Sequence, residues 1–311
     1  MITINNEEVR AHLPFPELIE GLRRAFANNP DVPARQHLRV PLEKQQDATL
    51  LLMPAWDSLY VGVKIATVFP DNGKKRLPAV DAIYILKNGS TGQSLAVLDG
   101  TELTRIRTAA ASALASTFLS RKKSSNLLMI GAGALAAPLI RAHCCVRPIE
   151  KVWVWNRSPA KLETLRQELE SEFELTIVTD LQEAISNADI ITCATMSDTP
   201  LVHGKDVKPG AHIDLVGAYL PTMRESDAPL IATSKVFVDT RHGACAEGGD
   251  LVQAAKESAF SMNDIQAELS ELCQQTHSGR KSETEVTVFK SVGASLEDLV
   301  AASIVYNRFQ S

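Results

Sequence analysis

The sequence lacks the features that mark membrane-spanning, secreted and nucleic-acid-binding chains. No apolar run reaches the roughly 18 residues that a transmembrane helix needs. Residues 1–13 lack the basic, apolar and small-residue zones of a signal peptide. The 37 acidic residues outnumber the 32 basic ones, which gives a formal net charge of −5 and argues against neutralisation of a row of phosphates. We therefore expect a cytoplasmic protein that binds neither nucleic acid nor membrane.

Cysteine is scarce as well. The chain has five cysteines in 311 residues, an odd number that forms no disulfide framework, and no CxxC or HxxxH spacing predicts a metal site. Cys144 and Cys145 are neighbours in a predicted helix, and we expect both thiols to lie in the core. The sequence thus indicates a reduced chain without a metal centre.

The first third of the chain mixes helical and strand patterns. Apolar residues at helical spacing predict a helix over residues 16–28, and an alanine-rich run predicts another over 101–119. Short runs punctuated by Pro, Gly, Asp and Asn lie between these helices and predict hairpin strands. The runs are residues 37–41, 49–54, 60–69, 82–87 and 94–99.

From residue 124 onward, strand-like and helix-like segments alternate. Such alternation predicts a parallel sheet covered by helices on both faces. The tail, residues 295–309, predicts an amphipathic helix that returns to the first part of the chain. We therefore expect an α/β fold, with a Rossmann doubly wound parallel sheet over residues 121–293. A smaller α+β domain is expected from residues 1–120 together with 294–311.

A glycine motif follows the first strand of the alternating region. The apolar segment 127–130 precedes Gly131-x-Gly133-x-x-Ala136, and a helix follows. Gly131 permits a tight turn, Gly133 lets the backbone approach a pyrophosphate, and the helix N-terminus supplies N–H donors. A glycine turn without a ligand is the alternative, but the strand–helix context favours a dinucleotide site. Its contacts are expected at Gly131, Ala132, Gly133, Ala134, Leu135 and Ala136.

The end of the second strand bears on the choice of nicotinamide cofactor. NAD-binding proteins place Asp or Glu about 20 residues after the glycines, where it holds the ribose 2′-hydroxyl. This chain has Asn156, Arg157 and Ser158 there, which offer donors and a positive charge to a 2′-phosphate. The alternative is that Arg157 is an ordinary solvated charge. The segment favours NADPH over NADH.

Ordered motifs along nearly the whole chain resemble those of the ornithine cyclodeaminase/μ-crystallin family. The resemblance implies a homodimer, a substrate-binding and dimerisation domain at 1–120 with 294–311, and an NADP(H)-binding Rossmann domain at 121–293. It also implies a small amino or imino acid as substrate. The motifs are Pro33-Ala34-Arg35, Gly62-Val63-Lys64, Thr104-Arg105-Ile106-Arg107, Gly131-Ala132-Gly133, Val216-Gly217-Ala218, Glu247-Gly248-Gly249-Asp250 and Thr287-Val288-Phe289-Lys290.

The resemblance also assigns site residues. Arg35 and Arg107 would clamp the substrate carboxylate, and Lys64 would act as the catalytic group near that carboxylate or the reacting nitrogen. A guanidinium suits a carboxylate, but from the residues alone Arg35 and Lys64 can also be surface charges. Asp298 and residues 287–291 would shape the floor of the site. Further cofactor contacts are implied at Thr108, Ala194, Thr195, Val216, Gly217 and Ala218.

One departure from the family pattern bears on the reaction. The cyclodeaminases and alanine dehydrogenases of the family carry an Asp directly after a Gly-Gly or Gly-Ala pair, where this chain has Tyr219. A phenol with an ordinary pKa of about 10 cannot serve as a resting general base at neutral pH. Reduction of a preformed C=N bond does not need that base, and the ketimine reductases of the family also lack the Asp.

These observations favour an enzyme that uses NADPH to reduce a cyclic ketimine carboxylate. The expected reaction converts Δ1-pyrroline-2-carboxylate to L-proline, and Δ1-piperideine-2-carboxylate, giving L-pipecolate, is an expected second substrate. One alternative is an ornithine cyclodeaminase or amino-acid dehydrogenase of the same family. The other is a non-catalytic, crystallin-like protein that binds NADPH.

Overall fold

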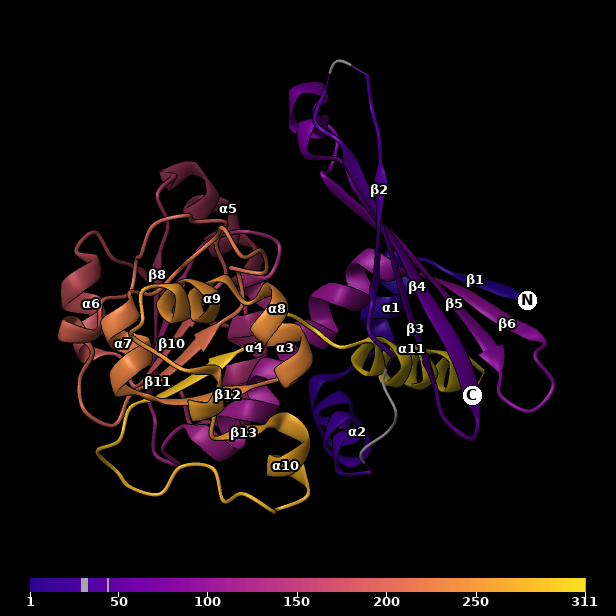
Figure 1. Cartoon of the computed structure of the whole chain (residues 1–311). Coiled ribbons are helices and arrows are strands. Elements are labelled where there is room, and N and C mark those ends of the chain that lie inside the picture. Colours follow the sequence, from indigo (N-terminus) through magenta and orange to yellow (C-terminus); the bar gives the residue numbers. More distant parts are fainter. Residues whose placement is uncertain (29–32, 44, 311) are drawn as a thin grey trace. The chain divides into compact units, whose positions relative to one another are not determined.

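The computed structural model describes residues 1–28, 33–43 and 45–310, and the chain divides into two compact units (Figure 1). Unit 1 comprises Met1–Ala25, Asn29–Arg107 and Ala294–Ser311, and unit 2 comprises Phe26–Asn28 and Thr108–Gly293. The division falls within helix α3 (Gly100–Leu119), whereas the sequence-based boundary followed this helix. Within the described residues, no helix combines the length and apolar character needed to cross a bilayer.

Unit 1 contains a six-stranded sheet with the strand order β1-β6-β5-β4-β3-β2. β1 pairs with β6 in parallel, and the other neighbouring strands pair antiparallel. The hairpin strands predicted from the sequence are all present, whereas β1 was not predicted. The strands are β1 (Ile2–Ile4), β2 (Gln36–Val40), β3 (Ala48–Trp56), β4 (Tyr60–Val68), β5 (Val80–Asn88) and β6 (Ser94–Asp99).

The C-terminal helix covers one face of this sheet. α11 packs against β3, β4 and β5, and α2 lies close beside it, because a Cβ at Gly21 would come within 3.0 Å of Val300 Cγ1. Alternation along β4 and β5 turns Lys64, Ala66, Tyr84 and Leu86 into the buried side. The helices of unit 1 besides α3 are α1 (Asn6–Ala11), α2 (Phe15–Ala27), η1 (Pro70–Lys75) and α11 (Ser295–Gln310).

Unit 2 contains an eight-stranded, entirely parallel sheet with the order β13-β12-β14-β11-β10-β7-β8-β9. The chain moves outward from β7 to β9 and then returns to build the other half from β10, which confirms the predicted doubly wound sheet. β14 comes late in the chain but pairs between β11 and β12. The strands are β7 (Asn126–Ile130), β8 (Lys151–Trp155), β9 (Leu175–Ile177), β10 (Ile190–Cys193), β11 (His212–Leu215), β12 (Lys235–Val238), β13 (Ala267–Glu268) and β14 (Thr287–Lys290).

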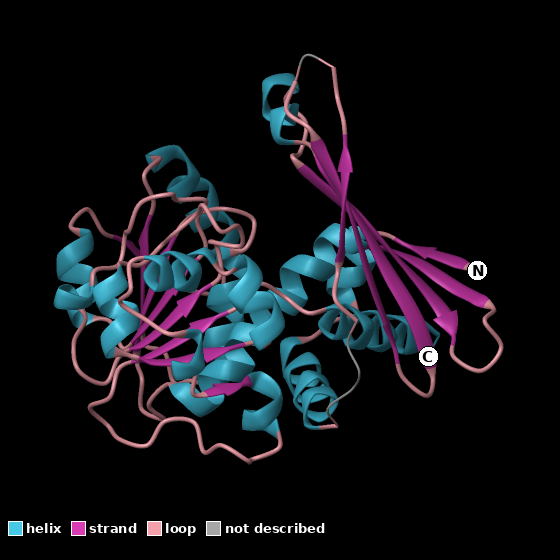
Figure 2. Cartoon of the chain, viewed as in Figure 1, coloured by secondary structure: helices cyan, strands magenta, loops and turns pink. Residues whose placement is uncertain are grey.

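Helices flank the unit 2 sheet (Figure 2), and apolar residues of both strands and helices form its core. The short helices after β11 were not predicted. The helices are α4 (Ala136–Val146), α5 (Pro159–Leu169), α6 (Leu181–Asn187), η2 (Gly204–Asp206), α7 (Ala228–Thr233), α8 (Arg241–Glu247), α9 (Gly249–Lys256), η3 (Met262–Asp264) and α10 (Leu269–Cys273).

The two adjacent cysteines of α4 correct one prediction. Cys144 is half-buried and Cys145 is exposed, so the expectation that both thiols lie in the core was wrong. Successive residues on a helix are rotated by about 100°, and α4 buries Ala142 and His143. Cys144 and Cys145 therefore turn away from the core, whereas Cys193 on β10 is buried.

Candidate functional site

Unit 1 contains a buried ionic cluster built on β4, α3 and the first turn of α11. Lys64 Nζ donates to Asp298 Oδ2 at 2.8 Å and Oδ1 at 3.0 Å, and to Thr104 Oγ1 at 3.1 Å. Arg107 Nε donates to Asp298 Oδ1 at 3.1 Å, and its Nη1 donates to Glu297 Oε2 at 2.5 Å. Lys64 and Arg107 are at most 4% exposed, and the two acids are fully buried. One carboxylate, that of Asp298, thus holds both cations.

Burial and neighbouring charges set the protonation of the cluster. Burial lowers the pKa of Lys64 from 10.5 to about 8; Asp298 opposes this shift, whereas Arg107 and Arg35 add to it. Burial also acts to lower the pKa of Arg107, but Asp298 and Glu297 outweigh it and raise that pKa. Lys64 is therefore mostly protonated at neutral pH and loses its proton as the pH rises through about 8.

The three substrate ligands named from the sequence lie in the same unit. Lys64 and Arg107 share Asp298, and the half-buried Arg35 acts electrostatically on Lys64. Arg107 Nη2 has no hydrogen bond within the described residues, so this atom is free for a ligand carboxylate. Glu297 was not predicted. Its signal in the sequence was a pair of adjacent acids in the first turn of a largely apolar helix.

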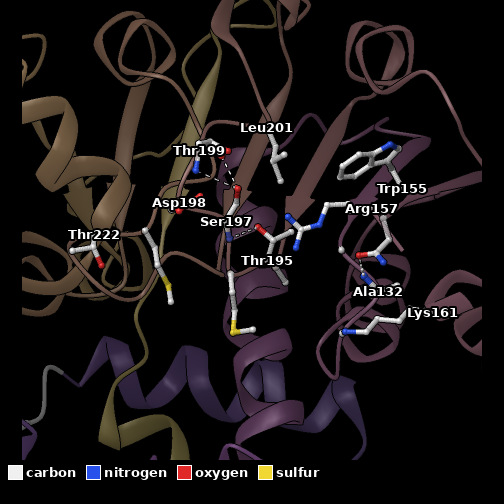
Figure 3. Close-up of a pocket in the computed structure, with 16 residues that line it drawn as sticks. Ala132, Trp155, Arg157, Lys161, Thr195, Ser197, Asp198, Thr199, Leu201 and Thr222 are labelled. Carbon is white, nitrogen blue, oxygen red and sulfur yellow. Dashed lines mark hydrogen bonds between the residues drawn. The ribbon is translucent and has the colours of Figure 1, made fainter. Parts of the chain in front are cut away.

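Unit 2 contains a pocket of about 710 Å³ beside the carboxyl ends of β7, β8 and β10 (Figure 3). The pocket is lined by residues 131–133 after β7, by Trp155 at the end of β8 with residues 156–157 after it, and by residues 194–199 after β10. Ligands of open parallel sheets bind at this edge, where the strand order reverses. The pocket therefore lies where a dinucleotide is expected.

The glycine turn fits a dinucleotide phosphate. Gly131 has φ +111°, and a Cβ there would lie 2.6 Å from the carbonyl oxygen of Ala194, so the turn requires glycine. A Cβ at Gly133 would meet nothing within 4 Å, which leaves open space for a ligand beside the backbone. At the start of α4, Ala136 N donates to Gly133 O and Pro138 has no N–H, which leaves the N–H of Ala137 and the positive end of the helix dipole to face an anion.

The pocket contains only part of the predicted cofactor set. Asn156 Oδ1 accepts from Ala132 N at 3.3 Å, so this amide supports the glycine turn. The predicted residues that line the pocket are Gly131, Ala132, Gly133, Asn156, Arg157, Ala194 and Thr195. Those that do not line it are Thr108, Ala134, Leu135, Ala136, Ser158, Val216, Gly217 and Ala218.

Lys161 on α5 is a pocket residue that the sequence reasoning missed. Its ammonium lies on the same side of the pocket as Arg157 and Trp155, at the right of Figure 3. Neither Lys161 nor Arg157 forms an ion pair within the described residues, and both are exposed. The only signal in the sequence was a second cation four residues after Arg157.

Tyr219 is the residue that the family resemblance aligns with an Asp in part of the family. The residue is half-buried, and burial raises the pKa of its hydroxyl above 10. At neutral pH the hydroxyl is therefore ionised even less than its ordinary pKa implies, so it is not available as a general base.

Comparison with known proteins gives a consistent result. A model of the ornithine cyclodeaminase/mu-crystallin family matches residues 2–311. A Delta(1)-pyrroline-2-carboxylate reductase of Colwellia psychrerythraea is 39% identical, covering 99% of this chain and 99% of its own. The structure of Thermococcus litoralis Delta(1)-pyrroline-2-carboxylate reductase with NADH and L-proline has a TM-score of 0.93 at 34% identity, covering 100% of this chain and 98% of its own. An archaeal alanine dehydrogenase dimer with bound NAD has a TM-score of 0.90 at 29% identity, covering 99% and 95%. The chain therefore belongs to the ornithine cyclodeaminase/mu-crystallin family.

Proposed function

We propose that this oxidoreductase uses NADPH to reduce a cyclic ketimine carboxylate, Δ1-pyrroline-2-carboxylate, to L-proline. The observation that carries the proposal is the Asp298 carboxylate that holds Lys64 and Arg107 together in a buried site. A cyclic imino acid presents a carboxylate and an imine nitrogen, which match a guanidinium and an ammonium. The named activity of the Colwellia relative and the L-proline bound to the Thermococcus reductase support the same substrate.

The charges of the cluster suit a substrate with one negative charge. Arg107 and Arg35 act electrostatically on Lys64, and Glu297 and Asp298 act on Arg107. A substrate carboxylate adds a negative charge next to these cations. Arg107 Nη2 and Arg35 bind that carboxylate, and two contacts from separate segments fix the orientation of the ring. A six-membered ring carries the same two groups, so Δ1-piperideine-2-carboxylate is a second substrate, giving L-pipecolate.

Lys64 provides the proton that the imine nitrogen gains. With a pKa of about 8, its ammonium is protonated at neutral pH and close enough to its pKa to transfer the proton. Reduced nicotinamide, when bound, supplies hydride to C2. Asp298 and Thr104 hold the Lys64 ammonium in place through three hydrogen bonds, and one of these is exchanged for a hydrogen bond to the substrate nitrogen when the imine binds.

We assign the cofactor to the unit 2 pocket and infer a preference for NADPH. Arg157 and Lys161 offer two positive charges to a 2′-phosphate, and residues 156–158 carry no carboxylate that would repel it. The Thermococcus complex contains NADH, so the comparison supports a nicotinamide dinucleotide without supporting the phosphate.

We also infer a homodimer formed through the uncovered face of the unit 1 sheet. On the face opposite α11, apolar side chains of neighbouring strands remain exposed, including Trp56 at 45%, Val61 at 38% and Ile83 at 42%. A self-complementary apolar face is typical of a two-fold interface, and the archaeal alanine dehydrogenase is described as a dimer. The cytoplasmic location stays a prediction from the sequence.

The proposed reaction is tested by following NADPH and NADH absorbance with both cyclic imines and by measuring the products. Consumption of NADPH that equals the L-proline formed is the expected result. Release of ammonia and proline from ornithine with NAD would instead indicate a cyclodeaminase. Tight NADPH binding without turnover of either ring would indicate a non-catalytic, crystallin-like protein.

A further inference from the structure

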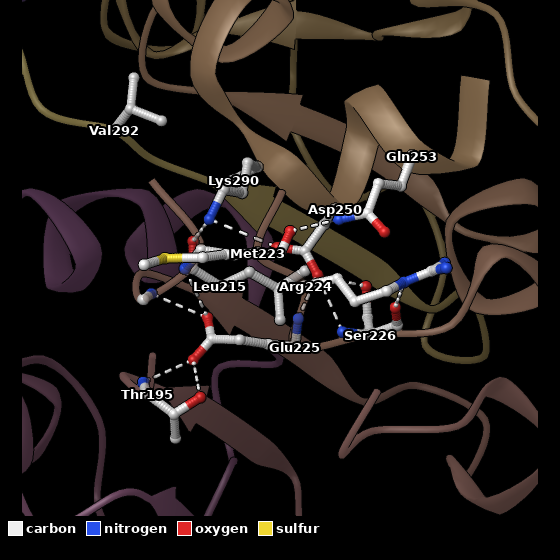
Figure 4. Close-up of polar contacts among 12 residues, drawn as sticks. Thr195, Leu215, Met223, Arg224, Glu225, Ser226, Asp250, Gln253, Lys290 and Val292 are labelled. Carbon is white, nitrogen blue, oxygen red and sulfur yellow. Dashed lines mark hydrogen bonds and ion pairs between the residues drawn. The ribbon is translucent and has the colours of Figure 1, made fainter. Parts of the chain in front are cut away.

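A second buried cluster, in unit 2, links two loops at the carboxyl edge of the sheet (Figure 4). The fully buried Glu225 carboxylate accepts four hydrogen bonds. Its Oε1 accepts from Thr195 N at 2.6 Å and Thr195 Oγ1 at 2.8 Å. Its Oε2 accepts from Gly217 N at 2.7 Å and Ala218 N at 3.3 Å. Thr195 lies just after β10 and Gly217 just after β11, so one side chain ties the ends of two neighbouring parallel strands.

The loops after β10 and β11 pack closely against each other and against the Glu225 carboxylate. A Cβ at Gly217 would lie 2.0 Å from the carbonyl oxygen of Thr195 and 2.4 Å from Glu225 Oε1. Thr195 and Ala194 line the pocket assigned to the cofactor. The position of Glu225 therefore sets the shape of one wall of that pocket.

Asp250 fixes the backbone of Glu225, and Lys290 lies beside Asp250. Asp250 Oδ1 accepts from Glu225 N at 2.7 Å and from Ser226 N at 2.8 Å. Lys290 Nζ at the end of β14 lies 3.4 Å from Asp250 Oδ2 and donates to Leu215 O at 3.1 Å. Lys290 and Asp250 are fully buried. The backbone of Glu225 is thus fixed by one carboxylate, and a buried ammonium lies near both acids.

Other groups around Glu225 influence its ionisation. Burial raises the pKa of Glu225 to about 7; Lys290 opposes the shift, and Asp250 adds to it. The Cys193 thiol on β10 also faces Glu225, and burial raises the pKa of that thiol well above its usual value, so the thiol stays neutral. Arg224 is adjacent in the chain, but its guanidinium pairs with Glu257.

We propose that Glu225 is a positioning residue whose ionised carboxylate holds the loops after β10 and β11 in the conformation that binds the dinucleotide. The proposal rests on the assignment of the cofactor to this pocket. Three of the four hydrogen bonds to the Glu225 oxygens come from backbone N–H groups, which can only donate. A proton on Oε2 would face the N–H groups of Gly217 and Ala218 and break a contact there, and the amide NH2 of a glutamine would face N–H groups at either oxygen position.

The test measures dinucleotide binding to the full chain without any imine, through the change in tryptophan fluorescence, to which Trp155 in the pocket contributes. Glu225→Gln is expected to weaken binding about tenfold or more, because charge-assisted hydrogen bonds are lost. Glu225→Asp keeps the carboxylate and is expected to weaken binding less than Glu225→Gln does.

The pH dependence separates positioning from a purely structural role. NADH is used for this series, because the 2′-phosphate of NADPH itself titrates near pH 6, as phosphate monoesters do. In the wild-type protein the dissociation constant of NADH is expected to rise as the pH falls through about 7. This rise is expected to be absent in Glu225→Gln.

Asp214→Asn is a matched control. Asp214 is also fully buried and also bridges β10 and β11, accepting from Thr192 Oγ1 at 2.8 Å, but it lies within the strands and does not line the pocket. This variant is expected to lower the melting temperature without changing the affinity for NADH or its pH dependence.

Equal loss of affinity in Asp214→Asn and Glu225→Gln, or a wild-type affinity independent of pH, would overturn the role of Glu225. If Glu225→Gln does not fold, the wild-type pH series and the Glu225→Asp affinity decide the question. Wild-type protein that binds NADH with the expected pH dependence but reduces no cyclic imine would contradict the proposed reaction and leave the positioning role intact.

Discussion

The Lys64 ammonium and the Asp298 carboxylate lie 2.8 Å apart, although 234 residues separate them in the sequence. Lys64 is carried by a strand in the middle of the unit 1 sheet, and Asp298 by the first turn of the helix that covers it. Both side chains are buried, so each charge depends on the other for compensation. The Lys64–Asp298 ion pair therefore contributes to the stability of unit 1 and also positions the proposed catalytic lysine.

Removing the Asp298 charge should destabilise the protein. Asp298→Asn leaves Lys64 and Arg107 with one counter-charge fewer in a buried site, and we expect the free energy of unfolding to fall by roughly 3 kcal/mol. Urea denaturation measures this loss. Glu17→Gln, which removes an exposed partner of Arg308, is the control and should cost less than about 1 kcal/mol. A similar loss of unfolding free energy in both variants would show that the buried ion pair stabilises the protein no more than an exposed one does.

Arg107 should govern affinity for the imino acid. Arg107→Ala removes the proposed contact from Nη2 to the substrate carboxylate, and we expect KM for Δ1-pyrroline-2-carboxylate to rise about tenfold or more. Steady-state kinetics at saturating cofactor provide the measurement. Arg105→Ala, which removes a cation paired with Glu102 on the same helix, should leave KM nearly unchanged. Near-normal kinetics in Arg107→Ala would exclude Arg107 as a substrate ligand.

The proton supplied by Lys64 should appear in the pH profile. Because the pKa of Lys64 is lowered to about 8, the ammonium loses its proton as the pH rises through that value. We therefore expect kcat/KM for the imine to be highest below about pH 8 and to fall above it. In Lys64→Met the overall rate should drop and this alkaline fall should vanish. A fall at the same pH in the Met variant would assign it to another group.

Arg157 and Lys161 should discriminate between the two nicotinamide cofactors. Substituting either residue by alanine removes a charge proposed to face the 2′-phosphate, and we expect KM for NADPH to rise about tenfold. KM for NADH should change little. Arg166→Ala is the control. Arg166 lies on α5, as Lys161 does, but it pairs with Glu163 and does not line the pocket. Equal effects on both cofactors would contradict the phosphate contact.

The dimer proposed for unit 1 should be sensitive to charge on the exposed sheet face. Ile83→Lys places an ammonium in the centre of that apolar face, and burying it unpaired in an interface is unfavourable. Sedimentation should therefore show a dimer for the wild-type protein and a monomer for the variant. Ile177→Lys changes an equally exposed isoleucine of unit 2 and should remain dimeric. A monomeric wild-type protein would contradict the interface.

The parts of the fold that the sequence predicted depend on local pattern. The turn at Gly131 and the hairpin strands such as β4 and β5 follow from neighbouring residues alone. β14 escaped prediction because a short apolar run, Thr287–Lys290, does not distinguish a buried strand from a loop or helix end. Its place between β11 and β12 depends on pairing with strands formed much earlier in the chain.

The same distinction applies to the sites. Arg35, Lys64 and Arg107 were identified through family motifs, whereas the role of Glu297 as a partner of Arg107 depends on how α11 packs on the sheet. Glu225 gave no signal, because nothing in its neighbours indicates that its carboxylate reaches the ends of two strands. The pocket residue Lys161 is likewise defined by how α5 meets β8. Contacts between distant segments thus account for most of what the sequence did not predict.

The late position of β14 and α11 also constrains how the protein is made. β14 separates β11 from β12 in unit 2, and α11 covers the sheet of unit 1. Until residues 287–310 have left the ribosome, neither unit has the segment that completes its core, and β11 and β12 each lack one of their two neighbouring strands. Until β14 emerges, the facing edges of β11 and β12 therefore stay unpaired, and such edges can recruit other chains.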